Sequence, residues 1–250
     1  MDTLRPWAAG WIAALVLCSG AMAADNKVVR LTSLDWPPYT SPSMQEQGAS
    51  AAVARAAFGA MGYRLEIDFF PWSRAVKMAQ HDSRYMGYFP EYYAPNQART
   101  FVFSDAMGSG PLGFAQRTDA PITWHTIDDL ARYRIGVVQD YVNTEEFDQR
   151  VAKGQLKVDV TMNDLLNLRK LANQRIDLAI IDRNVMNHLL HSESSLTAAK
   201  GKIQFNAKML ENKKLYICFK RSAEGEKLSK VFNAGLKKID VDAIMARHLK

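Results

Sequence analysis

Few side chains in this 250-residue sequence stand at the spacings that catalysis requires. His188 and His191 lie three residues apart in a helix-like segment, where two imidazoles can share a metal ion, but no neighbouring cysteine or carboxylate completes a ligand set. Glu145 and Glu146 open another helix-like segment, where acidic side chains complement the helix dipole. The sequence contains no P-loop, no Gly-x-Ser-x-Gly elbow and no Cys-x-x-Cys pair. We therefore predict no metal, no cofactor and no catalytic residue.

Aromatic residues instead gather beside turn-forming residues at two places. Between residues 86 and 105 the sequence combines tyrosines and phenylalanines with prolines and a glycine, and residues 36–39 form a second cluster, Trp-Pro-Pro-Tyr. Aromatic side chains on surface turns usually stack on another group or fill a gap, so ligand binding is one interpretation. Packing between two parts of the protein is the other interpretation of Trp36 and Tyr39.

Strand-like and helix-like periodicities alternate along the chain. Strands are predicted at residues 28–33, 64–70, 85–88, 112–116, 133–138, 156–160, 178–181 and 214–219. Helices are predicted at residues 48–61, 74–80, 127–131, 144–152, 162–172, 183–190, 224–236 and 241–249. Because strands that alternate with helices pair in parallel, the pattern predicts an α/β protein whose sheets are flanked by helices.

The order of these elements predicts two lobes. A second α/β series begins after a turn-like segment near residue 118, and the last strand and helices follow its completion. We expect lobe one to take residues 24–118 and 207–250, and lobe two to take residues 119–206. Each lobe would contain a mixed, mostly parallel sheet, and the double-stranded linker would bend as a hinge. Loops beyond the carboxyl ends of the strands would then meet in a small-molecule cleft between the lobes.

The first 23 residues have the pattern of a cleaved export signal. Arg5 precedes an apolar run at residues 8–17, and residues 21–23, Ala-Met-Ala, fit the small-x-small cleavage motif. We expect cleavage after residue 23 and export of the mature protein. Lipidation at Cys18 is an alternative, which the bulky Leu17 before it disfavours.

Composition limits the possible partners. The net charge is +6, but the basic residues are scattered without a block of five like charges, so we predict no nucleic-acid partner. After loss of the signal, Cys218 is the only cysteine, and no intrachain disulfide is possible. Its apolar neighbours indicate a core residue rather than a nucleophile.

Five segments, taken together in their order and spacing, resemble a known family over about residues 27–249. The segments are Ser33–Tyr39, Phe70–Ala75, Phe103–Asp105, Asp129–Val138 and Arg175–Asp182. The chain resembles the type II periplasmic solute-binding proteins of ABC transporters, solute-binding family 3. The resemblance implies a monomer that closes its lobes on a small polar solute, such as an amino acid, and then docks on an inner-membrane ABC permease.

The resemblance also implies ligand contacts at particular positions. Tyr39 matches the aromatic residue that lies over the ligand, and Trp36 stands beside it. Asp182 matches the acid that pairs with an α-ammonium, although a helix cap before Arg183 is an alternative role. A turn in lobe one and a loop in lobe two, which donates N–H groups to a carboxylate, supply the remaining contacts. These are Phe89, Pro90 and Tyr92 in the turn, and Asp140, Tyr141 and Val142 in the loop.

One position departs from the family pattern. Amino-acid binders of the family carry an arginine that forks onto the ligand carboxylate, and the matching residue here is Gln97. A neutral amide does not supply that bidentate charged pair. Arg99 or Arg74 is the alternative donor, and each can also be a solvated surface arginine. The resemblance therefore implies a solute-binding protein more firmly than an amino-acid binder.

We predict a periplasmic substrate-binding protein that delivers a small polar solute to an ABC transporter, and not an enzyme. One alternative is a periplasmic enzyme on the same scaffold, similar to cyclohexadienyl dehydratase, for which Glu91 is the candidate acid. Another is a sensory or accessory binding protein without its own permease.

Overall fold

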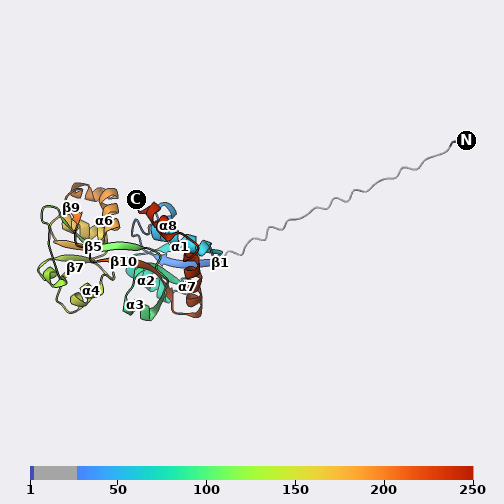
Figure 1. Cartoon of the computed structure of the whole chain (residues 1–250), viewed down its shortest axis with the longest axis horizontal. Coiled ribbons are helices and arrows are strands. Elements are labelled where there is room, and N and C mark those ends of the chain that lie inside the picture. The colour runs from blue at the N-terminus through green and yellow to red at the C-terminus, as the bar shows by residue number, and fades with distance from the viewer. Residues whose placement is uncertain (3–26, 250) are drawn as a thin grey trace.

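The structure, a computed structural model, describes residues 1–2 and 27–249 (Figure 1). The predicted signal segment and Cys18 therefore lie almost entirely outside the described residues. No helix within the described part of the chain is both long and apolar enough to cross a membrane.

Lobe one contains a five-stranded sheet. Parallel pairing joins β1 (Lys27–Ser33) to β2 (Tyr63–Phe69) and β3 (Gly87–Tyr92), whereas β10 (Glu211–Lys220) runs antiparallel to β3 and to β4 (Phe101–Phe103). The helices that accompany this sheet are α1 (Ala49–Gly59), α2 (Trp72–His81), α3 (Pro95–Thr100), α7 (Ala223–Leu236) and α8 (Val241–His248), with a short 3₁₀ turn at Gln45–Gln47. The last elements of the chain lie with this sheet, since β10 pairs with β3, and α7 and α8 both pack on α1.

Lobe two repeats this plan. Parallel pairing joins β6 (Ile135–Val138) to β7 (Val158–Thr161) and β8 (Leu178–Asp182), and β8 runs antiparallel to β5 (Ser109–Arg117). The edge strand β9 (Ile203–Phe205) pairs with β5. The remaining elements are α4 (Glu145–Ala152), α5 (Asp164–Ala172), α6 (Arg183–Ser192) and 3₁₀ helices at Ile127–Arg132 and Ser194–Ala199. Because β6, β7 and β8 are parallel, α4, α5 and α6 all begin at the same edge of the sheet.

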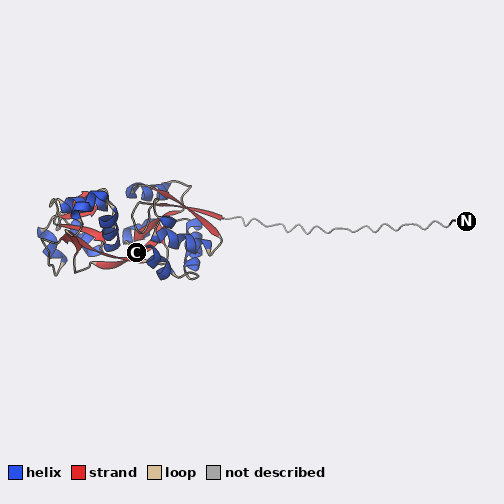
Figure 2. Ribbon diagram, turned by 90° about the horizontal axis from the view of Figure 1, so that it is seen from above, coloured by secondary structure: helices blue, strands red, loops and turns tan. Residues whose placement is uncertain are grey.

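Two antiparallel strands connect the lobes. β10 pairs with β5 over residues 211–214 and with β3 over residues 215–219, so one strand belongs to both sheets. Figure 1 shows β5 and β10 crossing between the two bodies, and Figure 2 shows the same division from above. This is the two-lobed α/β architecture with a double-stranded hinge that the sequence predicts.

One local feature differs from the sequence interpretation, and one glycine motif does not have the structure that its spacing suggests. The aromatic segment from Phe89 to Tyr92 is part of strand β3 rather than a turn, because its pairing with β10 continues as far as Tyr92. Glycines 108, 110 and 113 have the spacing of a dinucleotide-binding fingerprint. They lie at and within the long strand β5, not at a strand-to-helix turn, so this spacing does not form a phosphate loop.

Helix α7 packs closely against α1 at Gly235. A Cβ added there would lie 2.1 Å from the carbonyl oxygen of Ala57, so Gly235→Ala is expected to destabilise the fold by about 1–3 kcal/mol. Gly59 at the end of α1 is the matched control, because a Cβ there meets nothing within 4 Å, and Gly59→Ala should stabilise by roughly 0.4–1 kcal/mol. Urea titrations of both variants measure the difference. Equal effects would contradict the close approach of the two helices.

Candidate functional site

Four charged side chains are buried in the described part of the chain, and all four lie near the junction of the lobes. They are Glu91, Asp164, Asp182 and Lys213, each between 2 and 7% exposed. Burying a charge costs free energy unless a partner compensates for it, so such a cluster is a candidate site.

The two oxygens of Asp182 have different partners, and one of them makes the helix cap that the sequence offered as the alternative role. It ends β8 and is the N-cap of α6, where Oδ1 accepts hydrogen bonds from the backbone N–H groups of Asn184 (2.7 Å) and Val185 (3.3 Å). Oδ2 faces lobe one and accepts a hydrogen bond from the Tyr39 hydroxyl at 3.1 Å. The Asn184 side-chain amide donates to the same hydroxyl at 2.8 Å. Burial raises the pKa of Asp182 to about 7.

A second acid of lobe two makes a parallel contact. Asp164 is the first residue of α5, and its Oδ2 accepts a hydrogen bond from Trp36 Nε1 at 3.1 Å. Burial raises its pKa to about 7, and the nearby Asp182 contributes to the rise. The sequence interpretation missed Asp164. Its position after the strand next to β6, at the same sheet edge as Asp182, was the signal that could have found it.

Lobe one contributes the third acid. Glu91 lies in β3, where its side chain accepts hydrogen bonds from the Tyr88 hydroxyl at 3.1 Å and the Tyr92 N–H at 2.8 Å. Burial raises its pKa to about 8, whereas the charge of Lys213 lowers it. Lys213, on hinge strand β10, holds its Nζ 5.5 Å from the Tyr92 ring centroid and 3.5 Å from Glu211 Oε2. Sequence reasoning missed Lys213, since nothing in a strand pattern marks a lysine as buried.

Aromatic rings surround these acids. Trp36 and Tyr39 stack with their centroids 4.6 Å apart, and Tyr92 meets Trp36 edge-on at 6.1 Å. Tyr141 of lobe two meets Trp72 of lobe one at 6.0 Å. A cavity of about 30 Å³ remains between the lobes, lined by Leu34, Trp36, Trp72, Pro90, Glu91, Tyr92, Tyr141, Val142 and Leu215.

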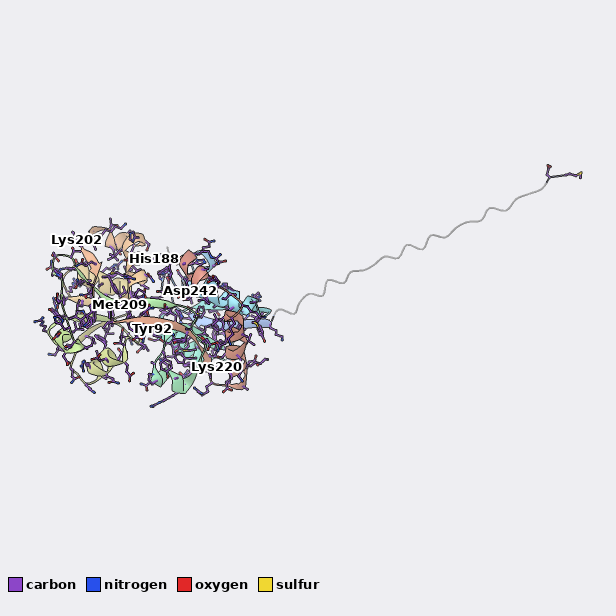
Figure 3. The ribbon with its side chains drawn as sticks, viewed as in Figure 1. Tyr92, His188, Lys202, Met209, Lys220 and Asp242 are labelled. Carbon is purple, nitrogen blue, oxygen red and sulfur yellow. The ribbon has the colours of Figure 1, made fainter. Side chains whose placement is uncertain are left out.

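Tyr92 stands at the centre of this arrangement. Figure 3 shows it in the middle of the molecule, beside the crossing strands. Its hydroxyl is buried and has no hydrogen-bond partner among the described residues. Burial and the charges of Asp182 and Asp164 raise its pKa, so the hydroxyl is a neutral group available to a solute.

The backbone of hinge strand β5 lies directly against the Tyr39–Asp182 hydrogen bond between the lobes. A Cβ at Gly110 would lie 2.1 Å from Asp182 Oδ2 and 2.2 Å from the Tyr39 hydroxyl. A side chain at this position would therefore push the two groups apart, and only glycine fits here.

The loop before α4 makes a further contact between the lobes. Asp140, with a left-handed φ of 61°, accepts hydrogen bonds from Trp72 Nε1 on its carbonyl (3.0 Å) and from Ser73 Oγ on its carboxylate (2.5 Å). The N–H and side-chain amide of Asn143 both donate to Asp148, at 2.9 Å. The Asn143 N–H is therefore already bonded to a carboxylate of the protein itself, that of Asp148.

The remaining predicted residues fall into separate groups. Phe89 is buried, and its carbonyl accepts a hydrogen bond from Ser33. Gln97 lies outside the cavity, in an open groove of about 860 Å³ that α3, α4 and β10 line together. Arg74 is exposed and stacks 5.1 Å over Phe70, and Arg99 is also exposed. Neither arginine is thus brought together with the buried acids.

The other chemistry-bearing residues lie apart from this site. Among residues 27–249, no three His, Cys, Asp or Glu side chains are placed to hold a metal ion. His191 bonds the Asn187 carbonyl through Nδ1. Cys218 is fully buried, which raises the pKa of its thiol.

Solved structures of the same architecture come from proteins with different roles. A histidine kinase sensor domain with similarity to periplasmic binding proteins matches with a TM-score of 0.75 and 18% identity, over 89% of this chain and 96% of that one. An amino acid ABC transporter substrate-binding protein from Streptococcus pneumoniae, bound to L-arginine, matches at 0.70 and 12%, over 88% and 94%. An ancestral amino-acid-binding protein, a precursor of cyclohexadienyl dehydratase, matches at 0.70 and 15%, over 89% and 96%.

Searches against protein-family models and curated proteins find no match. The likeness to solved structures extends over nearly the whole chain, and at these identities it shows the fold. The chain has the two-lobed fold of the periplasmic binding proteins.

Proposed function

We propose that this protein is an exported receptor that captures a small polar solute between its lobes. One observation carries the proposal: ring donors of lobe one meet buried carboxyl groups of lobe two, at Tyr39–Asp182 and Trp36–Asp164. Charged and polar groups are rarely buried at a movable interface without a function. A hinge of two strands allows the groups to separate and meet again.

Capture in such a receptor follows from differential contact. A solute that touches both lobes only when they are together shifts the equilibrium toward the closed form by its extra binding free energy. The solute must replace some of the protein's own contacts, because the present cavity of about 30 Å³ holds roughly two water-sized groups.

The proposal includes delivery to an inner-membrane ABC permease by a monomeric protein in the periplasm. The similarity to a transporter substrate-binding protein supports this role, and the similarity to a sensor domain supports signalling as the rival. Uptake of labelled solute by cells with and without this protein separates the two. Equal uptake, together with a lost transcriptional response, would favour the sensor.

The first test is a thermal-shift screen of the mature protein, purified from the periplasmic fraction. Amino acids, amines, short peptides and carboxylic acids are the candidate solutes. A true solute at about 100 times its dissociation constant should add roughly 2.7 kcal/mol of stability. Small-angle scattering should show the same solute shifting the particle toward the closed form. If no compound class stabilises the protein, the receptor proposal fails.

A second candidate function rests on Glu91. This carboxyl group lines the cavity, and its pKa of about 8 keeps it largely protonated at neutral pH, which is the state a general acid needs. Turnover of a cyclohexadienyl acid by the wild-type protein, lost in Glu91→Gln, would establish an enzyme. Tight binding of a solute without turnover would exclude this function for that solute.

A further inference from the structure

We infer that the solute is a small organic ammonium ion that carries no carboxylate group. The inference rests on the proposed receptor function and adds the chemical class of the solute. It comes from the buried charges, the donors that now satisfy them, and the aromatic faces around them.

The charge balance of the site favours a cation. Three of the four buried charged side chains are acids, and Lys213 is the single base among them. Lys213 already lies near Glu91, Asp148 and Glu211, whose carboxyl groups share its charge. A bound cation would compensate the acids that Lys213 leaves unpaired, whereas a bound anion would add to the imbalance.

The hydrogen bonds at the two aspartates favour an N–H donor. Asp164 and Asp182 each present one oxygen to lobe one, and each accepts from a neutral ring donor, Trp36 Nε1 or the Tyr39 hydroxyl. An ammonium group has three N–H donors and a full charge, so its bonds to the same oxygens would be shorter and stronger. The free Tyr92 hydroxyl is a further acceptor for such a group.

The aromatic rings favour the same ligand. Trp36, Tyr92 and Tyr141 line the cavity together with Glu91, and Tyr39 stacks on Trp36 behind it. A cation over such faces is attracted by the ring quadrupoles, most strongly where water is excluded. Tyr141 and Val142 line both the cavity and the open groove, so the two spaces adjoin, and the groove is the nearest place for the remainder of a longer amine.

A carboxylate has no evident partner in this site. Arg74 stacks on Phe70 at the surface, and Arg183 lies over Phe205 with its Cζ 5.7 Å from the ring centroid. The Asn143 N–H is bonded to Asp148. Lys213 is the one buried base near the cavity, and its Nζ already lies 3.5 Å from Glu211 Oε2 and acts on Glu91 and Asp148. The carboxylate of an amino acid would therefore lie close to three buried acids and compete with the protein's own carboxyl groups for Lys213.

Matched pairs of compounds test the inference, because each pair differs by one carboxylate. Isothermal calorimetry on the mature protein compares cadaverine with lysine, putrescine with ornithine and agmatine with arginine. We expect at least one amine to bind about tenfold or more tightly than its amino acid. Asp164→Asn should weaken that amine by a similar factor. Asp119→Asn removes the same charge at an exposed ion pair, where the carboxylate is 69% exposed, and should leave binding unchanged.

The outcomes separate this inference from the receptor proposal. If amino acids bind as tightly as the amines, or more tightly, the ammonium assignment is wrong and the receptor stands. The same conclusion follows if only an anion or a neutral compound binds in the wider screen. If nothing in that screen binds, both proposals fall together.

Discussion

Replacing Asp182 with asparagine is expected to weaken solute binding by roughly a hundredfold or more, equal to about 2.7 kcal/mol. The substitution removes the charge from the oxygen that faces lobe one. Removing one partner of a buried charged pair typically costs about 3–5 kcal/mol, because the other partner remains buried and unpaired. Calorimetry with the solute identified by the screen measures the loss.

Asparagine is chosen because it preserves the helix. Its side-chain oxygen can still accept the Asn184 and Val185 N–H groups that Oδ1 now binds, and asparagine is as good an N-cap as aspartate. The melting temperature should therefore fall little. Asp182→Ala also removes the cap and should lose about 1 kcal/mol of stability in addition. Normal solute affinity in a folded Asp182→Asn protein would remove Asp182 from the site.

The second large effect is a dependence of lobe closure on pH. Burial between the lobes raises the pKa of Asp164 and Asp182 to about 7, and that of Glu91 to about 8. If the lobes separate, the two aspartates return toward water and their pKa values toward the ordinary range near 4. The closed form then binds more protons than the open form between about pH 4 and pH 7.

The sign follows from this difference. A group whose pKa is higher in the closed form favours closure when it is protonated, so closure is strongest below about pH 4 and weakens as pH rises from about 4 through about 7. A rise of three pKa units corresponds to about 4 kcal/mol for one aspartate, an upper value because water and relaxation reduce it. The groups that face the pair, Tyr39, Tyr92 and Tyr141, have raised pKa values and stay neutral over this range.

Small-angle scattering without solute, from about pH 4 to pH 9, tests this prediction. The radius of gyration should increase with pH in the wild-type protein. The double variant Asp164→Asn/Asp182→Asn should show a flatter profile, because neither amide titrates. A radius of gyration that is constant in the wild-type protein, or that decreases with pH, would contradict the predicted coupling between protonation of the aspartates and lobe closure.

The sequence predicted the architecture because that information is local and repeated. Alternating periodicities, capping residues and the late strand at 214–219 indicated two α/β lobes and a double connection, as observed. Asp182 was also accessible to sequence reasoning, since a carboxylate directly after a buried strand lies at the binding edge of a parallel sheet. Its division into one capping oxygen and one facing oxygen required the three-dimensional contact with Tyr39.

The residues that sequence reasoning missed depend on contacts between distant segments. Trp36 and Asp164 are 128 positions apart, and only closure of the lobes turns a helix-start acid into part of a binding surface. Lys213 is buried because β10 passes between the two sheets, a consequence of topology rather than of its own neighbours in the sequence. The assignment of Gln97 remains a prediction, and its position in the outer groove favours a contact with the solute's outer end.

The close approach of Gly110 to the Tyr39–Asp182 hydrogen bond affects the order in which contacts between the lobes break when the lobes open. When two bodies turn about a hinge, each atom moves in proportion to its distance from the axis. The Tyr39–Asp182 bond lies against hinge strand β5 and therefore moves less than contacts farther from the hinge. A small rotation can therefore separate those contacts while this bond only stretches. The outer edges of the lobes would separate first, while the Tyr39–Asp182 hydrogen bond near the hinge is still formed. A solute could then enter before this bond breaks.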